Sequence, residues 1–488
     1  MPGSAFEPVR LPDAIWQRPE TLAALRARDI GALLHIIRRN AGASQIRLSA
    51  AIGFSQGRVS EIMRGARQVT RLDVLERVAA GLDMPDHARI ALGIAPTGGP
   101  SVDPATTASE LAISPDLGLA YPDQLSANVE TVTSLWHADR EPALIAQAPV
   151  EPAAWNDTSL RWLTASDAEQ SLERQTGPRI GAADVERFRD TVDYFAALDN
   201  RFGGGHARQA LISYLRDDGG RLLNGRYTST VASSLYAAVA EATLLAAWMS
   251  YDSAPESGLA QRYFVQALAL AQAGHDRLLG ASILDAMSHQ ATFVGRYREA
   301  ANLARAARTG TQGVATPTLT AHFHVMEARA HARLGDARAC DSALSEAVTQ
   351  FERRTPDEDP EWISYFDDAE LSAEFGHCFR DLGRPVDATQ YANQCLGTIN
   401  DTTFLRSDFF ATMVLADAHL DAGEAEQACG VALEALKAGE QLRSARGVSY
   451  LREFNQRLTR CGDFAEKSRF EDQAREFRLW RIASRPAQ

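Results

Sequence analysis

A residue pair that begins with glycine recurs along the second half of the chain at nearly regular intervals. The pairs start at Gly295, Gly335, Gly383, Gly423 and Gly462, so they are 40, 48, 40 and 39 residues apart. A period of this length limits the fold to stacked supersecondary units that bury one face against the next unit. Around the first four glycines, small or apolar residues stand seven positions before and five, nine and twelve after: Ser288, Ala328, Gly376, Ala416; Ala300, Cys340, Ala388, Ala428; Ala304, Leu344, Ala392, Ala432; Ala307, Ala347, Cys395, Ala435.

Small residues on both sides of a turn are expected where the two antiparallel helices of a hairpin cross closely. Their spacing resembles the tetratricopeptide repeat, which implies a C-terminal α-solenoid. We assign residues 184–488 to this repeat domain and expect an earlier, more degenerate hairpin within residues 231–272. At Gly462 the small position is occupied by Lys467, which predicts a terminal cap with a polar face.

A stripe of polar residues accompanies the repeat. Six positions before the glycines stand His289, Arg329, His377 and Asp417, and Arg333 and Arg380 lie on the same predicted face. The first helix of each pair would line the groove of such a stack. Two interpretations remain open: the stripe binds a peptide or small ligand, or it is a solvated surface.

A glycine-rich string near the start of the repeat region is a second candidate site. Three glycines at 203–205 follow Asn200 and Arg201 and precede His206. Such a string can expose backbone N–H groups to an anion, but no Gly-Lys-Ser/Thr follows, so it is not a P-loop. A plain loop between helices is the alternative.

The net charge of the chain, −13, hides a strong asymmetry. Residues 26–95, the basic head, carry eleven Arg and six acidic residues, a net +5, whereas the remainder is acidic. Acidity of the whole chain therefore does not exclude DNA, and it predicts that contact is confined to the head.

The basic head has the pattern of short helices separated by glycines, expected at 29–40, 44–52, 56–64 and 71–82. Gly53-Phe54-Ser55 forms the turn of a helix-turn-helix pair. The second helix of such a pair enters the major groove, N-terminal residues first. Those residues here are Gln56, Gly57 and Arg58, with Ser60 and Glu61 following; Ser55 caps this helix, Ser44 and Gln45 suit a phosphate, and Arg64 and Arg67 add phosphate contacts.

The head also resembles a known family. The string Ser-Gln-x-x-Leu-x-x-x-x-Gly-Phe-Ser-x-x-x-Val-Ser-x-Ile-x-x-Gly-x-Arg, from Ser44 to Arg67, is similar to the XRE-type helix-turn-helix of phage repressors and bacterial regulators. The resemblance implies a five-helix bundle that dimerises on a two-fold-related operator. Over its whole length the chain resembles large actinobacterial regulators that join such a head to a degenerate tetratricopeptide body and act in antibiotic production or development. Those proteins carry Ser-Glu where this chain has Gly57-Arg58, which predicts a different operator.

The remaining segments complete an all-α organisation. Residues 1–28 are expected to be an N-terminal arm, 29–95 the helix-turn-helix domain, 96–124 a flexible linker rich in Pro and Gly, and 125–183 a helical connector. The connector contains a predicted helix at 125–138. Trp155 and Trp162 are expected to be packing anchors, with a nucleotide-stacking platform as the alternative.

Several functional classes have no support in the sequence. No HExxH or CxxC motif occurs, and we expect no enzyme, no cofactor and no metal. Five scattered Cys and the absence of a signal-like N-terminus favour the cytoplasm. The most apolar run, 235–251, contains Glu241, so we expect no membrane partner.

The function expected from these features is sequence-specific transcriptional regulation. The partners would be a double-stranded DNA operator, a second copy of the chain in a homodimer, and a small-molecule, peptide or protein effector of the repeat domain. The alternative is a protein-interaction scaffold or antitoxin-like adaptor that uses the repeat groove, with DNA binding secondary.

Overall fold

The computed structural model describes residues 9, 11–66, 69, 72–94, 116–139, 148–165, 176–255, 257–398 and 405–484. The chain divides into two compact units: residues 1–111 with Gln209–Tyr214 of helix α12 (Arg208–Tyr214), and residues 112–208 with 215–488. Within the described ranges there is no strand, and one isolated bridge joins Arg179 to Arg226. The predicted all-α fold is therefore confirmed.

The N-terminal unit contains the four helices predicted from the sequence, a fifth as the resemblance implies, and, among its described residues, two more before them. Helix α2 packs against both α3 and α7, and Trp16 and Leu25 are buried. The predicted arm is therefore wrong for residues 13–26, because their apolar side chains complete the core of the bundle. The helices are α1 (Asp13–Trp16), α2 (Pro19–Arg26), α3 (Ile30–Ala41), α4 (Gln45–Ile52), α5 (Gln56–Met63), α6 (Leu72–Gly81) and α7 (Asp86–Leu92).

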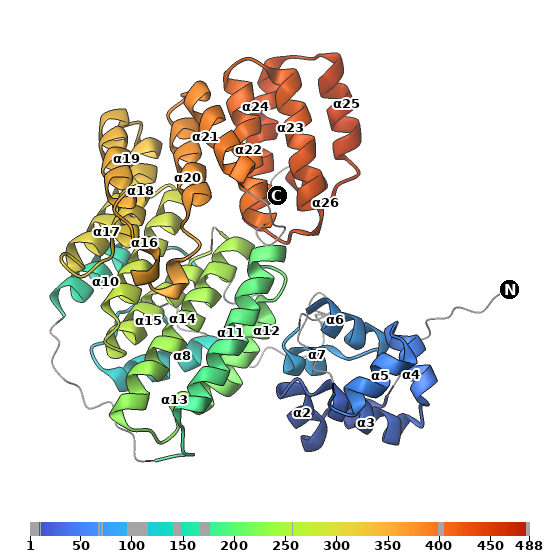
Figure 1. Cartoon of the computed structure of the whole chain (residues 1–488). Helices are drawn as coiled ribbons and strands as arrows, with labels where there is room; N and C mark the ends of the chain where they lie inside the picture. Colours follow the sequence, from blue (N-terminus) through green and yellow to red (C-terminus); the bar gives the residue numbers. More distant parts are fainter. Residues whose placement is uncertain are drawn as a thin grey trace. The chain divides into compact units, whose positions relative to one another are not determined.

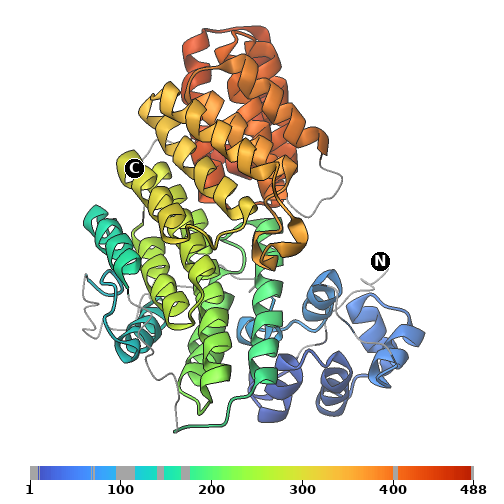
Figure 2. The same cartoon turned by 60° about the vertical axis from the view of Figure 1, so that its left-hand side comes forward.

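The C-terminal unit is built around consecutive helical hairpins, which follow one another in chain order from α14 to α25 (Figures 1 and 2). We call these six hairpins the hairpin stack. Five are α14 (Ser229–Ser253) with α15 (Leu259–Ala273), α16 (Arg277–Phe293) with α17 (Tyr297–Gly310), α18 (Pro317–Leu334) with α19 (Ala337–Phe351), α20 (Asp368–Asp381) with α21 (Pro385–Thr398), and α22 (Leu405–Asp421) with α23 (Ala425–Ala438). The sixth consists of α24 (Ala445–Leu458) and α25 (Ala465–Ala474), which meet through the rings of Phe454 and Phe470, 5.9 Å apart. The other helices are α8 (Leu125–Ala138), α10 (Pro152–Thr164), α11 (Ala182–Phe202), α13 (Gly220–Leu223) and α26 (Arg478–Ala483).

The small residues around the recurring glycines lie where the two helices of each hairpin meet. The hydroxyl of Ser288, seven positions before Gly295, donates to the carbonyl of Ala300, five positions after it, over 2.8 Å. An added Cβ on Gly376 would lie 3.5 Å from the amide nitrogen of Ala392 on the facing helix. Larger side chains would push these helices apart, which explains the pattern in the sequence.

The first helices of successive hairpins form a continuous row. They contact one another in order, from α14 through α16, α18, α20 and α22 to α24, and we call their shared side the first-helix face. Helix α11 contacts both α14 and α22, and α14 also contacts α24. The first and sixth hairpins, far apart in the sequence, therefore meet.

Helix α14 is the one helix among the described residues that is long and apolar enough to cross a membrane by length and composition. Most of its apolar side chains, including Leu235 and Met249, are buried, and it packs against α11 and α15. The carboxylate of Glu241 pairs with Arg189 of α11 at 3.3 Å. The helix thus has the surroundings of a core helix in the stack.

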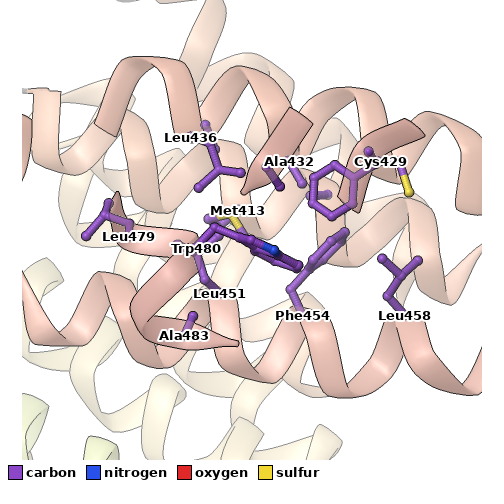
Figure 3. Close-up of a cluster of buried hydrophobic side chains, with 14 of the residues drawn as sticks. Met413, Cys429, Ala432, Leu436, Leu451, Phe454, Leu458, Leu479, Trp480 and Ala483 are labelled. Carbon is purple, nitrogen blue, oxygen red and sulfur yellow. The ribbon is translucent and has the colours of Figure 1, made fainter. Parts of the chain in front are cut away.

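The C-terminal end of the stack is closed by an apolar cluster from α22 to α26. Figure 3 shows Trp480 of α26 lying among Met413, Leu451 and Phe454. Helix α25 has exposed polar residues, as the predicted terminal cap requires. Lys467 itself is buried, because its ammonium group turns back and donates to the carbonyl of Gly462 over 3.0 Å.

The connector packs on the hairpin stack. Helix α8 has the predicted bounds, and the amide of Asn128 donates to the side-chain oxygen of Gln266 over 2.9 Å. Trp155 and Trp162 are completely buried, which confirms them as packing anchors. The guanidinium carbon of Arg277 lies 3.6 Å from the ring centroid of Trp162 and fixes α10 to the stack.

The predicted linker, 96–124, has a different extent. Its residues 96–115 lie outside the described residues. The amide of Gln266 donates to the carbonyls of Gly118 and Ala120 over 2.9 and 3.1 Å. The prediction of a tether is therefore wrong for 116–124, because this segment supplies hydrogen-bond acceptors to a buried side chain.

Candidate DNA-binding site and polar first-helix face

Helices α4 and α5 are joined by the predicted turn, and both begin at a serine cap. Gly53 has a φ of 65°, in the left-handed region that favours glycine. The amide of Arg47 donates to the hydroxyl of Ser44 over 3.2 Å, and the amide of Arg58 to that of Ser55 over 3.3 Å. Local chemistry therefore sets the start of both helices.

Two close crossings hold this pair of helices in place. An added Cβ on Gly31 of α3 would lie 2.6 Å from the carbonyl oxygen of Ile62 in α5, and one on Gly81 of α6 would lie 2.3 Å from that of Ala51 in α4. Neither position tolerates a side chain. The orientation of α4 and α5 is thus fixed by backbone contact with α3 and α6.

The residues predicted to face DNA lie around the N-terminal ends and exposed sides of α4 and α5. Space beside Gly57 is open, because an added Cβ there meets no atom within 4 Å. The amide of Gln45 is engaged in a weak contact, 3.6 Å from the sulfur of Met63. Ser44, Ser55, Gln56, Gly57 and Arg64 are exposed, Gln45, Arg58, Ser60 and Glu61 are half-buried, and Arg67 lies outside the described residues.

A family model described as a helix-turn-helix domain matches residues 29–92. These residues form a helix-turn-helix domain. In such a domain the second helix of the pair is the one that enters the major groove, which here is α5. A comparison of the chain with curated proteins found no significant match.

Two residues of the helix-turn-helix domain contribute in ways that the sequence did not suggest. The imidazole Nε2 of His35 lies 2.9 Å from the carbonyl oxygen of Met63 at the end of α5. The guanidinium carbon of Arg58 lies 4.2 Å above the ring centroid of Phe54 in the turn. The contact between Phe54 and Arg58 could have been predicted from their spacing of four residues in the sequence.

The two histidines of the predicted polar stripe lie next to tyrosine hydroxyls. Nδ1 of His289 is 3.0 Å from the hydroxyl of Tyr251, and Nδ1 of His377 is 3.4 Å from that of Tyr450. Burial, followed by the positive charge of Arg329, lowers the pKa of both imidazoles well below its ordinary value. Both rings are therefore neutral at pH 7.

The arginines of the stripe are buried and paired within the same face. Arg329 donates to the carboxylate of Glu374, and Arg380 lies 2.7 Å from Asp381 and 3.6 Å from Asp417. Arg329 is 7%, Arg380 8% and Asp417 1% exposed. The interpretation as a solvated surface is therefore wrong for these residues, because neighbouring carboxylates take the place of water.

Arg333 lies at the edge of this buried set. It pairs with Asp381 at 3.4 Å and donates to the hydroxyl of Tyr297 over 3.3 Å. Its side chain is half-buried. The structure thus brings the predicted stripe residues into one polar cluster, and Arg333 connects that cluster to the surface.

Two carboxyl groups on the first-helix face titrate near neutral pH. Burial raises the pKa of Asp417 to about 7, against the opposing effect of Arg380 and Arg457. Burial, together with the charge of Glu374, also raises the pKa of Glu370 to about 7. The sequence offered no signal for these values, since each depends on helices that meet only in the folded stack.

The glycine-rich string is held by the chain's own residues. Asn200 accepts a hydrogen bond from Arg406 over 3.3 Å. The exposed Arg201 has its guanidinium carbon 5.1 Å from the ring centroid of Phe202, and the ring of His206 is 4.6 Å from the same ring. The contact with Arg406 ties the end of α11 to α22, whereas the two ring contacts are local to the string.

The glycine-rich string binds a carboxylate of the chain itself. The backbone N–H of Gly204 donates to the carboxylate of Asp252 over 2.8 Å, and that of Gly205 to the carbonyl of Arg443 over 2.9 Å. Asp252 also accepts from Ser444 and Arg446, each at 2.8 Å. Burial opposes its ionisation, but Arg446 and Arg406 outweigh this effect and lower the pKa of Asp252. The string therefore joins the end of α11 to α14 and to the start of α24 by hydrogen bonds.

Proposed function

We propose that this chain is a sequence-specific, DNA-binding transcriptional regulator that acts as a homodimer. The observation that carries the proposal is the helix-turn-helix geometry of α4 and α5, with Gln56, Gly57 and Arg58 at the N-terminal end of the second helix. Two such helices related by a two-fold axis would reach successive major grooves of a palindromic operator. The net positive charge of the head supports contact with phosphates.

The experiment that tests this proposal compares two arginines of the same helix-turn-helix domain. Operator binding by the full chain is measured as salt is raised, after selection of the operator from random DNA. Arg58→Ala should cost about 1–3 kcal/mol and relax preference at one base pair. Arg64→Ala, at an exposed position suited to a phosphate, should weaken all sequences alike and reduce the salt slope by about 1.

A control outside the domain makes the comparison quantitative. Arg469 is exposed on α25, and Arg469→Ala removes the same charge from the acidic C-terminal unit. This variant should bind the operator as the parent chain does. The proposal fails if the parent selects no sequence at any salt concentration, or if Arg469→Ala weakens binding as much as Arg64→Ala.

We further propose that the C-terminal unit is a tetratricopeptide-like sensor and dimerisation domain. The recurring hairpins and the buried polar cluster on the first-helix face support this part. A small molecule, peptide or protein that competes for one member of the cluster would loosen the contacts between hairpins. The measurement is operator affinity of the full chain with and without fractionated host extract, with sedimentation to give the oligomeric state.

The proposal places the protein in the cytoplasm, without a catalytic step, a cofactor or a membrane partner, and with genes of secondary metabolism or development as targets. An adaptor that binds another protein and uses DNA only secondarily is the competing function. It predicts that Arg58→Ala leaves the phenotype of the host intact. A genome-wide occupancy map of the parent and of Arg58→Ala separates the two.

A further inference from the structure

Arg58 is held on the recognition helix by a stacking contact. Its guanidinium carbon lies 4.2 Å from the ring centroid of Phe54, and that of Arg77, from α6, lies 5.8 Å from the same ring. Both distances are within the range of a cation–π interaction. One aromatic ring in the turn therefore carries a cation from α5 and a cation from α6.

The ring of Phe54 is itself firmly placed. Phe54 is 9% exposed, and its backbone N–H donates to the carbonyl of Ser49 over 2.9 Å. The preceding Gly53 takes the left-handed conformation that directs the chain into this position. A rigid ring limits the rotamers of the arginine that stacks on it.

The guanidinium of Arg58 has no hydrogen-bond or ion-pair partner within the described part of the chain, and its Nε is buried. Stacking uses the flat face of a guanidinium and leaves the N–H groups in its plane available. A guanine offers two acceptors, O6 and N7, that match two such coplanar donors. Gly57 next to Arg58 leaves open space where a base edge would approach.

We propose that Phe54 is a positioning residue: its ring orients the Arg58 guanidinium for bidentate recognition of one guanine, so Phe54 sets sequence preference without touching DNA. This inference rests on the proposed DNA-binding function. It assigns a role in DNA sequence specificity to a residue of the turn whose burial alone would indicate a core residue. It also predicts energetic coupling between positions 54 and 58.

The test uses the full chain and an operator selected from random DNA. The quantity measured for each variant is the ratio of the dissociation constants for operators with guanine and with adenine at each position. The variants are Phe54→Leu, Phe54→Tyr, Arg58→Ala and the double variant Phe54→Leu/Arg58→Ala. Phe54→Leu should reduce the guanine preference at the one position read by Arg58 by roughly three- to fivefold, the strength of one exposed cation–π contact. Phe54→Tyr keeps a ring and should retain the preference.

The double variant separates positioning from a general loss of structure. If Phe54 acts through Arg58, adding Phe54→Leu to Arg58→Ala should change the preference no further. Arg58→Lys provides a second test that leaves the core untouched, because it keeps the charge but lacks the planar donor pair. It should lose preference at the same position, with the salt slope unchanged.

Each outcome bears on one of the two claims. A parent chain that selects a sequence, with Phe54→Leu folded and equally selective, overturns the positioning role and leaves the proposed function standing. The positioning role is also overturned if Phe54→Leu loses preference equally at every operator position. It is overturned as well if Arg58→Lys keeps the preference of the parent. A parent chain that selects no sequence overturns the proposed function and this inference together.

Discussion

The backbone N–H of Gly204 donates to the carboxylate of Asp252, 2.8 Å away, inside the C-terminal unit. Asp252 is fully buried and accepts two more hydrogen bonds, from Ser444 and from Arg446. A string that looked suited to an external anion thus binds a carboxylate of its own chain. The bond joins the end of α11 to the first hairpin, and Arg446 joins both to the sixth.

Removing the carboxylate of Asp252 should strongly destabilise the C-terminal unit. Asp252→Ala leaves the Arg446 guanidinium buried without its partner, so the free energy of unfolding in urea should fall by about 3–5 kcal/mol. Asp341→Ala is the matched control, because it removes an exposed ion pair with Arg384. The control should cost at most about 1 kcal/mol. Equal costs for the two variants would show that the buried carboxylate of Asp252 contributes no more to stability than an exposed ion pair does.

Gly204 should not tolerate even a methyl group. An added Cβ would lie 2.5 Å from the carbonyl oxygen of Met249, so Gly204→Ala is expected to cost about 2 kcal/mol or more. Gly430, exposed within α23, has open space around it. Gly430→Ala should therefore stabilise the chain by about 0.5–1 kcal/mol. Thermal melts of the two variants should shift in opposite directions.

Stability should fall as pH rises through the range in which Asp417 ionises. The pKa of this carboxyl is raised from 3.8 to about 7 in the folded chain, so the folded state holds a proton that the unfolded state has lost. The stability gained from this proton is complete at low pH and is lost as pH rises toward 7. Between pH 5 and pH 7.5 the loss is roughly 2 kcal/mol for one such group.

Asp417→Asn isolates this contribution. The neutral amide cannot ionise, so the stability of the variant should fall less between pH 5 and pH 7.5 than that of the parent. Some decrease should remain, because Glu370, whose pKa is also about 7, still ionises in this range. The measurement is the free energy of unfolding against pH for both chains. Identical slopes would contradict the assignment of a raised pKa to Asp417.

Gly57→Ala should separate folding from DNA binding. The position is open in the free protein, so the alanine variant should melt at or slightly above the temperature of the parent. Its operator affinity should fall by roughly 1 kcal/mol or more if the α5 backbone approaches DNA closely. Gly397→Ala, at an exposed position of α21 with open space around it, is the control and should bind normally. Unchanged affinity of Gly57→Ala would place the DNA elsewhere.

Features set by short stretches of chain were predictable from the sequence. The caps at Ser44 and Ser55, the turn at Gly53 and the small residues around Gly295 follow from interactions within one hairpin or one turn. The contact between Ser288 and Ala300 was implied by their offsets from the same glycine. Local patterns therefore sufficed for the helix-turn-helix pair and for the hairpins.

The polar contacts of the C-terminal unit were beyond the reach of these patterns. Asp252 and Arg446 are 194 positions apart, and no periodicity in the sequence connects them. The pKa of Asp417 depends on burial by helices that come together only when the stack forms. A stripe of polar residues looks the same in sequence whether water or a neighbouring helix covers it.

The contact of α14 with α24 joins the first hairpin to the sixth, and it affects how the C-terminal unit unfolds. An open array of repeats can fray from either end, since each repeat is supported only by its neighbours. Here the first hairpin is bonded to the sixth, so neither end can detach without breaking buried bonds of the other. We expect a single cooperative melting step for all six hairpins, and slow refolding, because contacts of such long sequence separation must form before the unit is complete.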